Sequence, residues 1–170
     1  KPYGFQAFYP GPGLGGHCIP LDPYYLSWKA REYGFHTSMI ESSMMINDRM
    51  PEYTVERAMR ILNRSKKAMN GAKILVLGVA YTQDIDDYRE SPAIRVIEHL
   101  LKEGAKVCYY DLWVSKFKDG DLQMVSEREL SAEVLEDADL VLVTTSHTNV
   151  DYSFVQRHAK IVFDTKNALK

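Results

Sequence analysis

Short apolar segments alternate with helical segments through the second half of this 170-residue chain. Four runs have the length and apolar content of buried strands: residues 73–79, 106–110, 140–144 and 161–164. Helical periodicity separates them, over residues 91–103, 131–137 and 154–158. Strands that alternate with helices are joined by right-handed crossovers into a parallel sheet. The sequence therefore predicts an α/β fold, with a Rossmann-like parallel-sheet domain over residues 71–170.

Before residue 71 the pattern is that of a loop followed by helices. Residues 22–34 have apolar side chains at helical spacing, and Pro23 suits the first turn of a helix. Asp22 could cap this helix, and Gly34 would end it. We therefore expect the N-terminal loop to lead directly into a helix.

A second, longer helical stretch covers residues 41–69. Pro51 should kink it or begin a new segment, because a proline in a helix interior removes a hydrogen bond. Its apolar residues exceed what one small domain must bury, so we expect a connector or a homodimer interface. The chain then divides near residue 70, into a helical part (1–70) and an α/β domain (71–170).

Composition excludes several classes of protein. The net charge is −2, with no basic patch for nucleic acid and no acidic tail. The longest apolar runs are strand-sized, so no membrane-spanning helix is expected, and the N-terminus lacks both a signal-peptide core and an initiator Met. Only two cysteines occur, which favours a reducing, cytoplasmic setting. No Cys/His cluster has the spacing of a metal site. We expect the chain to be part of a longer protein.

A glycine-rich loop over residues 11–18 carries the candidate nucleophile. Three of its glycines match G-x-G-x-x-G, but no strand precedes them, so the context is wrong for a dinucleotide-binding turn. A loop that brings backbone donors close to a ligand fits better. A plain surface turn is the alternative.

Cys18, at the end of this loop, has two interpretations. A lone cysteine is usually a small buried apolar residue. A thiol after two glycines and near a helix N-terminus can instead be a nucleophile. Asp22, one turn later, is then either an N-cap or part of a covalent-catalysis site. Cysteine-dependent acyl transfer with His17 or His147 is a further alternative, although the spacing matches no familiar dyad. Cys108 lies mid-strand and is expected in the core.

The segment over residues 78–92 follows the first strand, at the sheet edge where α/β proteins bind ligands. It has one glycine, Gly78, where a dinucleotide-binding turn would have three. Arg89 precedes the helix start at Ser91, a place suited to phosphate. The alternative is a solvated cluster of charges. The same edge should also carry Asp111 and residues 144–147 and 164–167.

Four motifs resemble those of the UDP-glucose/GDP-mannose dehydrogenase family, in the family's order and over nearly the whole chain. They are G-x-G-x-G-G-x-C-x-x-x-D at 11–22, N-D-R-M-P at 47–51, G-V-A-Y with D-D-Y-R-E-S-P at 78–92, and F-D-T-K-N at 163–167. The residues around the cysteine are most similar to the branch that oxidises UDP-N-acetylhexosamines.

The resemblance implies that the C6 alcohol of a UDP-sugar is oxidised to a carboxylate by two hydride transfers to NAD. Cys18 would attack the intermediate aldehyde, giving a thiohemiacetal and then a thioester. Asp22 would position or activate the water that hydrolyses it. Arg89 would reach the NAD pyrophosphate. The UDP-sugar would contact Phe8, Tyr9, Gly13, Tyr81, Thr82 and Lys166.

Three positions depart from the family's pattern. The family often has lysine at the positions of Leu21 and Thr82, and arginine at that of Lys166, where lysine loses bidentate phosphate geometry. The resemblance makes residues 1–70 the C-terminal part of a central helical dimerisation domain that carries the catalytic-cysteine loop, and residues 71–170 a UDP-sugar-binding domain. It also places the NAD-binding domain, with a lysine and an asparagine that assist the chemistry, upstream of this chain. The chain alone would then be inactive. A UDP-sugar-binding and dimerisation module without activity, or a UDP-glucose 6-dehydrogenase, are the alternatives.

Overall fold

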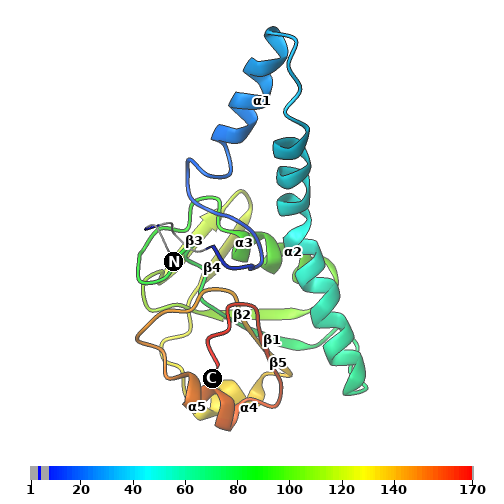
Figure 1. The fold of residues 1–170 in the computed structure, drawn as a ribbon. Coiled ribbons are helices and arrows are strands. Elements are labelled where there is room, and N and C mark those ends of the chain that lie inside the picture. The colour runs from blue at the N-terminus through cyan, green and yellow to red at the C-terminus, as the bar shows by residue number, and fades with distance from the viewer. Residues whose placement is uncertain (1–3, 5–7, 170) are drawn as a thin grey trace.

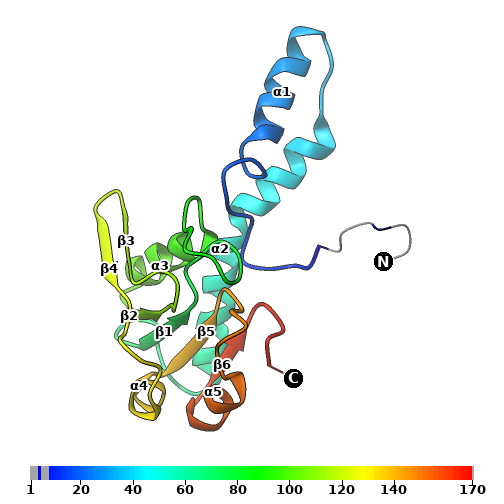
Figure 2. The same cartoon turned by 90° about the vertical axis from the view of Figure 1, so that its left-hand side faces the viewer.

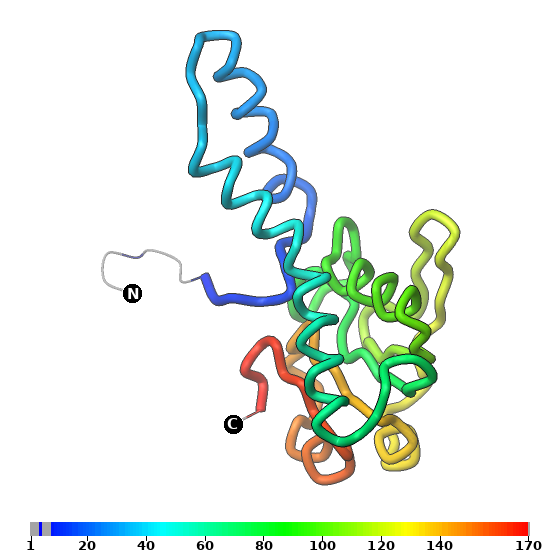
Figure 3. The backbone as a smooth tube through the Cα atoms, turned by 90° about the vertical axis from the view of Figure 1, so that its right-hand side faces the viewer, coloured from blue at the N-terminus to red at the C-terminus, as the bar shows by residue number. Residues whose placement is uncertain are grey.

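A helical hairpin projects from an α/β body (Figure 1). The structure is a computed structural model, and it describes residue 4 and residues 8–169. The hairpin consists of α1 (Asp22–Glu32) and α2 (Ser38–Arg64). The second helix continues into the body and lies beside it (Figure 3). One helix therefore belongs to both parts.

The body is built on a four-stranded parallel sheet in the order β2-β1-β5-β6. Its strands are β1 (Lys73–Leu77), β2 (Lys106–Tyr110), β5 (Leu140–Val143) and β6 (Val162–Asp164). Three helices lie between them in sequence: α3 (Pro92–Lys102), α4 (Ala132–Asp137) and α5 (Tyr152–His158). This confirms the predicted α/β fold with a Rossmann-like parallel sheet.

Alternate residues of the strands face two separate apolar cores. Ile74 and Val76 of β1 pack with α2 and α3, whereas Leu75 and Leu77 pack with α4 and α5. Figure 2 shows the sheet between these layers. The carboxyl ends of the strands and the loops that follow them therefore share one edge.

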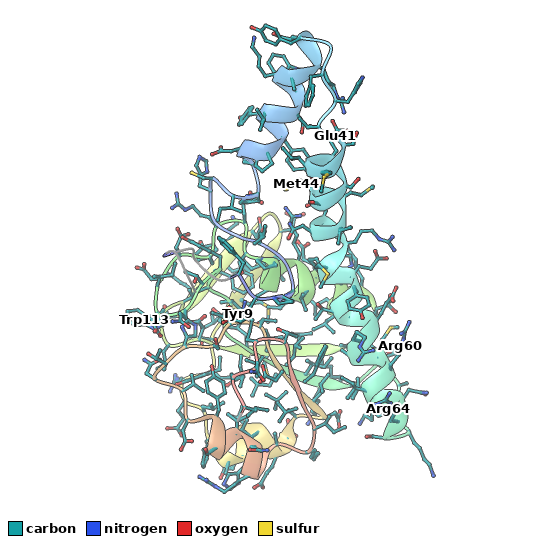
Figure 4. All side chains as sticks on the ribbon, viewed as in Figure 1. Tyr9, Glu41, Met44, Arg60, Arg64 and Trp113 are labelled. Carbon is teal, nitrogen blue, oxygen red and sulfur yellow. The ribbon has the colours of Figure 1, made fainter. Side chains whose placement is uncertain are left out.

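Helix α2 runs without interruption through Pro51. Of the two outcomes expected at Pro51, a kink or a new segment, the new segment is therefore wrong. The residues on both sides of the proline are held by packing: Met44 is buried where α2 contacts α1, and Val55 is buried in the body core. Tertiary packing thus outweighs the lost hydrogen bond. In Figure 4, Met44 lies in the hairpin, and Arg64 marks the end of α2 beside the body.

Asp22 does not cap α1, so that prediction is also wrong. The N-cap position belongs to Leu21, and Asp22 is the first helical residue. The reason lies upstream: the carbonyl of Cys18 accepts hydrogen bonds from the amides of Leu21 (3.1 Å) and Asp22 (2.8 Å). This turn starts the helix one residue early. The Asp22 carboxylate is left in the first turn, where the helix dipole favours negative charge.

A β-hairpin that the sequence analysis missed follows β2. It consists of β3 (Lys116–Asp119) and β4 (Leu122–Val125), which pair antiparallel across a turn at Gly120 (φ 53°). The buried ring of Phe117 lies 5.2 Å from that of Tyr109. Asp-Gly beside alternating polar and apolar residues is a known hairpin signal, so the sequence did contain the clue.

The apolar excess predicted for the long helix lies in the projecting hairpin. The second half of α2 is used in the body core, through Val55, Ala58 and Leu62. Large apolar side chains of the hairpin remain exposed: Tyr25, Leu26, Trp28, Tyr33, Phe35, Met39, Met45 and Ile46. No helix within the described part of the chain is long and apolar enough to span a membrane.

Candidate active site

The glycine loop packs directly on the segment that follows β1. The amide of Gly16 donates a hydrogen bond to the carbonyl of Arg89, at 3.1 Å. A Cβ atom on Gly15 would lie 2.5 Å from Cβ of Tyr81 and 2.9 Å from the carbonyl oxygen of Glu90. A side chain at Gly15 would push the two segments apart. The structure therefore brings two separate sequence motifs together into one site.

The other side of the loop rests on α2. The amide of Leu14 donates to Oδ1 of Asn47 at 2.9 Å, and the hydroxyl of Tyr24 donates to the carboxylate of Asp48. A cavity of about 310 Å³ opens here. Its lining includes Leu14, His17, Tyr24, Asn47, Glu90 and Arg95.

Cys18 is exposed. The alternative that it is a buried apolar residue is therefore wrong, because the residue lies in the turn before α1, outside both apolar cores. Asp22 is exposed one helical turn later. Cys108 is half-buried in β2, and burial raises the pKa of its thiol to about 11. Of the two cysteines, Cys18 alone combines exposure with a place in the loop.

A buried carboxylate holds the backbone of the loop after β1. Oδ2 of Asp111 accepts hydrogen bonds from the amides of Val79 (2.7 Å) and Ala80 (3.0 Å). Its Oδ1 accepts from the amides of Trp113 (2.8 Å) and Val114 (3.0 Å). Burial alone would raise the pKa of Asp111, but the hydrogen bonds from His147, Ala80 and Val79 favour the ionised form, and the net shift of the pKa is downward.

His147 completes this buried network. Its side chain is 1% exposed, and Nε2 lies 3.1 Å from Oδ2 of Asp111. Its Nδ1 accepts the amide hydrogen of Asp84 at 2.9 Å, so the ring proton sits on Nε2 and is donated to Asp111. Both ring nitrogens are engaged. The structure therefore argues against His147 as the base of an acyl-transfer dyad.

Sequence reasoning placed Asp111 and residues 144–147 at the edge where ligands bind, and they do lie there. In the structure they hold the backbone of the loop after β1 by hydrogen bonds. Thr144 and Thr145 add hydrogen bonds to the carbonyls of Gly78 (2.5 Å) and Ala80 (2.6 Å). The sequence signal was an aspartate directly after one strand and a Thr-Thr-x-His run after another.

Arg89 projects from this supported segment. Its side chain is 70% exposed, and its Nη2 lies 2.7 Å from Oδ2 of Asp87. A hydrogen bond from Arg89 lowers the pKa of Asp87, and the same bond raises that of Arg89. Tyr81 is half-buried against the glycine loop, while Thr82 beside it is exposed. The pair of Arg89 and Asp87 is solvated, as the alternative of a charge cluster expects. The Arg89 guanidinium remains accessible to a ligand.

Lys166 and Tyr9 line a second hollow, of about 570 Å³, beside the start of the loop. A Cβ atom on Gly11 would lie 3.0 Å from Nζ of Lys166. Desolvation around this amine lowers the pKa of Lys166, although the residue as a whole is exposed. Asp164 fixes the backbone here by accepting the amide of Lys166 at 2.8 Å. Tyr9 and Phe8 are exposed over most of their surface (Figure 4 labels Tyr9).

The predicted residues thus fall into groups. Gly13 lines the cavity beside α2, and Tyr9 and Lys166 line the second hollow. Cys18, at the end of the loop, and Asp22, at the start of α1, are exposed and lie outside these two cavities. Asn47, Asp111 and His147 support the site, and sequence reasoning assigned no such role to them.

The turn after β1 is not a dinucleotide-binding turn. A Cβ atom on Gly78 would lie 2.6 Å from Thr145, and the Gly78 amide donates to the carbonyl of Tyr110 at 2.9 Å. The turn after β1 is therefore filled by protein and offers no glycine cradle for a pyrophosphate. Arg89 offers one accessible cation. Among residues 4 and 8–169, no group of three or more His, Cys, Asp or Glu side chains could hold a metal ion.

Comparison with known proteins identifies the family of both parts of the chain. Residues 75–170 match the UDP-binding domain of the UDP-glucose/GDP-mannose dehydrogenase family, and residues 1–49 match its central domain. The solved structure of the UDP-D-ManNAc dehydrogenase from Pyrococcus horikoshii superposes with a TM-score of 0.79 at 27% identity, over 99% of this chain and 38% of that one.

Curated relatives are similar along most of the chain. A UDP-N-acetyl-D-mannosamine dehydrogenase from Methanocaldococcus jannaschii is 32% identical over 94% of this chain and 36% of its own length. A UDP-N-acetyl-D-glucosamine 6-dehydrogenase from Pseudomonas aeruginosa is 32% identical over 66% of this chain and 26% of its own length. The chain thus spans a little more than a third of the first relative's length and about a quarter of the second's. With more than half of its residues matched by the UDP-binding domain, the chain belongs to the UDP-glucose/GDP-mannose dehydrogenase family.

Proposed function

We propose that this chain is the C-terminal part of an NAD-dependent dehydrogenase that oxidises the C6 alcohol of a UDP-N-acetylhexosamine to a carboxylate. The observation that carries the proposal is the contact between Gly16 and Arg89, which joins the loop of the exposed Cys18 to the segment after β1. The named activities of the relatives support the substrate class. UDP-glucose is the alternative substrate.

In this proposal Cys18 is the nucleophile. NAD, when bound, accepts the two hydrides that the overall oxidation releases. The Cys18 thiol would add across the C6 aldehyde, its proton passing to the carbonyl oxygen, and so hold the carbon as a thiohemiacetal. Once the second hydride had gone to the bound NAD and the hydroxyl proton to water, the same sulfur would carry a thioester. Asp22, one helical turn away, then accepts a proton from the water that attacks the thioester carbonyl. The uronate leaves, and Cys18 is regenerated.

The UDP moiety would lie along the glycine loop, between the cavity beside α2 and the hollow lined by Tyr9 and Lys166. Lys166 would provide a positive charge for the diphosphate, since its amine already lies against the start of the loop. Tyr9, Phe8 and Tyr81 provide aromatic surface, and Gly13, which lines the cavity beside α2, would contact the sugar through its backbone. The exposed Thr82 would contact the nucleotide without adding charge.

The proposal assigns the rest of the cofactor site to residues outside this chain. Arg89 would contact the NAD pyrophosphate from this side, and an N-terminal NAD-binding domain would hold the remainder. We also propose a division of the chain at residue 70, a cytoplasmic location in keeping with two free cysteines, and a homodimer. Exposed apolar side chains of the hairpin, such as Trp28 and Phe35, favour such an interface.

Turnover assays on the longer protein that contains this chain test the proposal. We expect NADH to form with UDP-N-acetylhexosamines, and Cys18→Ala to abolish it. Cys108→Ala is the matched control and should retain turnover. The 170-residue chain alone should bind the UDP-sugar in a calorimetric titration without reducing NAD. Full turnover by Cys18→Ala would contradict the assignment, and binding without turnover by the longer protein would favour the binding-module alternative.

A further inference from the structure

Two consecutive residues of α2 hold both flanks of the cysteine loop. Oδ1 of Asn47 accepts the amide hydrogen of Leu14 at 2.9 Å, upstream of Cys18. The carboxylate of Asp48 accepts the hydroxyl hydrogen of Tyr24, downstream of it. The stretch that contains the thiol is therefore anchored at both ends to one turn of one helix.

Because residue 51 is a proline, the main-chain carbonyl of Asn47 is a second hydrogen-bond acceptor that faces the same loop. In an α-helix the amide of residue 51 would bond the carbonyl of residue 47, and proline has no amide hydrogen. A Cβ atom on Gly13 would lie 3.7 Å from this Asn47 carbonyl oxygen. Both the side chain and the main chain of Asn47 thus face the loop, at two adjacent loop residues.

These contacts lie outside the apolar core. The part of α2 that packs in the body core begins at Val55. The side chains of Leu14, Tyr24 and Asp48 are exposed. Loss of the Asn47 contact should therefore free the loop without unfolding the body.

We propose that Asn47 is a positioning residue for Cys18, with Asp48 acting through Tyr24 as the second anchor. This inference rests on the proposed role of Cys18 as nucleophile. Without the Oδ1 acceptor, the Leu14 amide loses its partner and the loop between Leu14 and Gly16 can shift. A misplaced nucleophile loses rate, whereas the UDP-sugar contacts elsewhere remain.

Three variants separate this role from a structural one. Asn47→Leu removes the acceptor at similar volume, and Asn47→Asp keeps an oxygen in the same place. Asn63→Leu makes the same change at an exposed position of the same helix. Amide hydrogen exchange at Leu14, followed by NMR in the 170-residue chain, reports the contact directly. Values of kcat and KM are measured in the longer protein.

For Asn47→Leu we expect at least tenfold faster exchange at Leu14 and a kcat lower by about 10- to 100-fold, because small misplacements of a reacting group have effects of this size. KM for the UDP-sugar and the melting temperature should stay near their original values. Asn47→Asp should keep the exchange rate at Leu14 and kcat within about threefold of their original values, because the carboxylate still accepts the Leu14 amide hydrogen. Asn63→Leu should change neither.

Unchanged exchange at Leu14 in Asn47→Leu would overturn the inference, and so would faster exchange with an unchanged kcat. A parallel fall in melting temperature, without rescue by Asn47→Asp, would mean a structural role only and would also overturn it. None of these outcomes concerns whether Cys18 is the nucleophile. That question is answered separately by Cys18→Ala, so the two failures remain distinguishable.

Discussion

The amide of Gly16 donates its hydrogen to the carbonyl of Arg89, at 3.1 Å. The two residues lie far apart in the chain, yet this bond joins the glycine loop and the segment after β1 into one continuous surface of the candidate site. Tyr81 fills the remaining space between the two segments. Changes at this contact should therefore affect ligand binding before they affect the fold of the body.

Gly15→Ala should separate the two segments. The added methyl group would lie 2.5 Å from Cβ of Tyr81 and 2.9 Å from the backbone oxygen of Glu90, so the loop must move. We expect the affinity for UDP-sugar to fall by about tenfold or more, because overpacking of this kind commonly costs 1–3 kcal/mol. Calorimetric titration measures it. Gly34→Ala, where nothing lies within 4 Å, is the control; equal affinities in the two variants would contradict this account.

Gly78→Ala should destabilise the body much more than Gly71→Ala. Both glycines have positive φ, at 85° and 81°, so both substitutions strain the backbone. Only the Cβ at position 78 meets a neighbour, with Thr145 at 2.6 Å. We expect a loss of about 1 kcal/mol in the free energy of unfolding for Gly71→Ala and about 3 kcal/mol for Gly78→Ala. Urea denaturation gives both values, and similar losses would count against the tight packing at Gly78.

Asp111→Asn should cost stability at neutral pH and progressively less in acid. The pKa of Asp111 is lowered in the folded state from an ordinary value of 3.8, so its ionised form stabilises the fold above that pH. This contribution is lost as the pH falls through the folded-state pKa. We expect a loss of about 3 kcal/mol near pH 7, since the amide supplies only one of the two acceptor oxygens.

Urea denaturation between neutral and acidic pH measures the difference between Asp111→Asn and the original chain. Asp121→Asn, at an exposed carboxylate beside the hairpin turn, is the control and should change little. A difference that stays constant down to pH values well below 3.8 would show that ionisation of Asp111 does not matter.

Lys166→Met should weaken UDP-sugar binding while leaving the fold intact. The amine lies against the start of the glycine loop, and charge-assisted bonds to phosphate contribute about 1.5–3 kcal/mol. We therefore expect a Kd about 10- to 100-fold higher at low salt. Lys160→Met, at another exposed lysine, should have no effect. If both variants bind equally well, Lys166 does not contact the diphosphate.

The parallel sheet could be predicted because its signal is local. Each strand is a short apolar run, and alternation with helices fixes the topology. The β3–β4 hairpin was missed although its Asp-Gly turn was visible. The contacts that support the site could not be found in this way. Asp111 bonds Val79 across 32 positions, and Asn47 bonds Leu14 across 33, and no periodicity in the sequence links such pairs.

The glycine loop was recognisable from its residues, but its surroundings were not. Its pattern predicted a nucleophile at Cys18, and the structure adds that this cysteine is exposed. The same pattern could not tell that Gly15 faces Tyr81, because steric contact depends on how the loop lies on the body. The position of Asp22 was predicted less well. The helix begins one residue earlier than expected, so Asp22 is its first residue and not its N-cap.

Helix α2 passes unbroken from the hairpin into the body core, so the number of residues along it fixes how the hairpin is rotated relative to the sheet. One residue inserted between Pro51 and Val55 would rotate the hairpin by about 100° and move it about 1.5 Å along the helix axis relative to the sheet. The turn that carries Asn47 would then face away from the loop. Natural variation in the length of this helix should therefore be confined to its two ends.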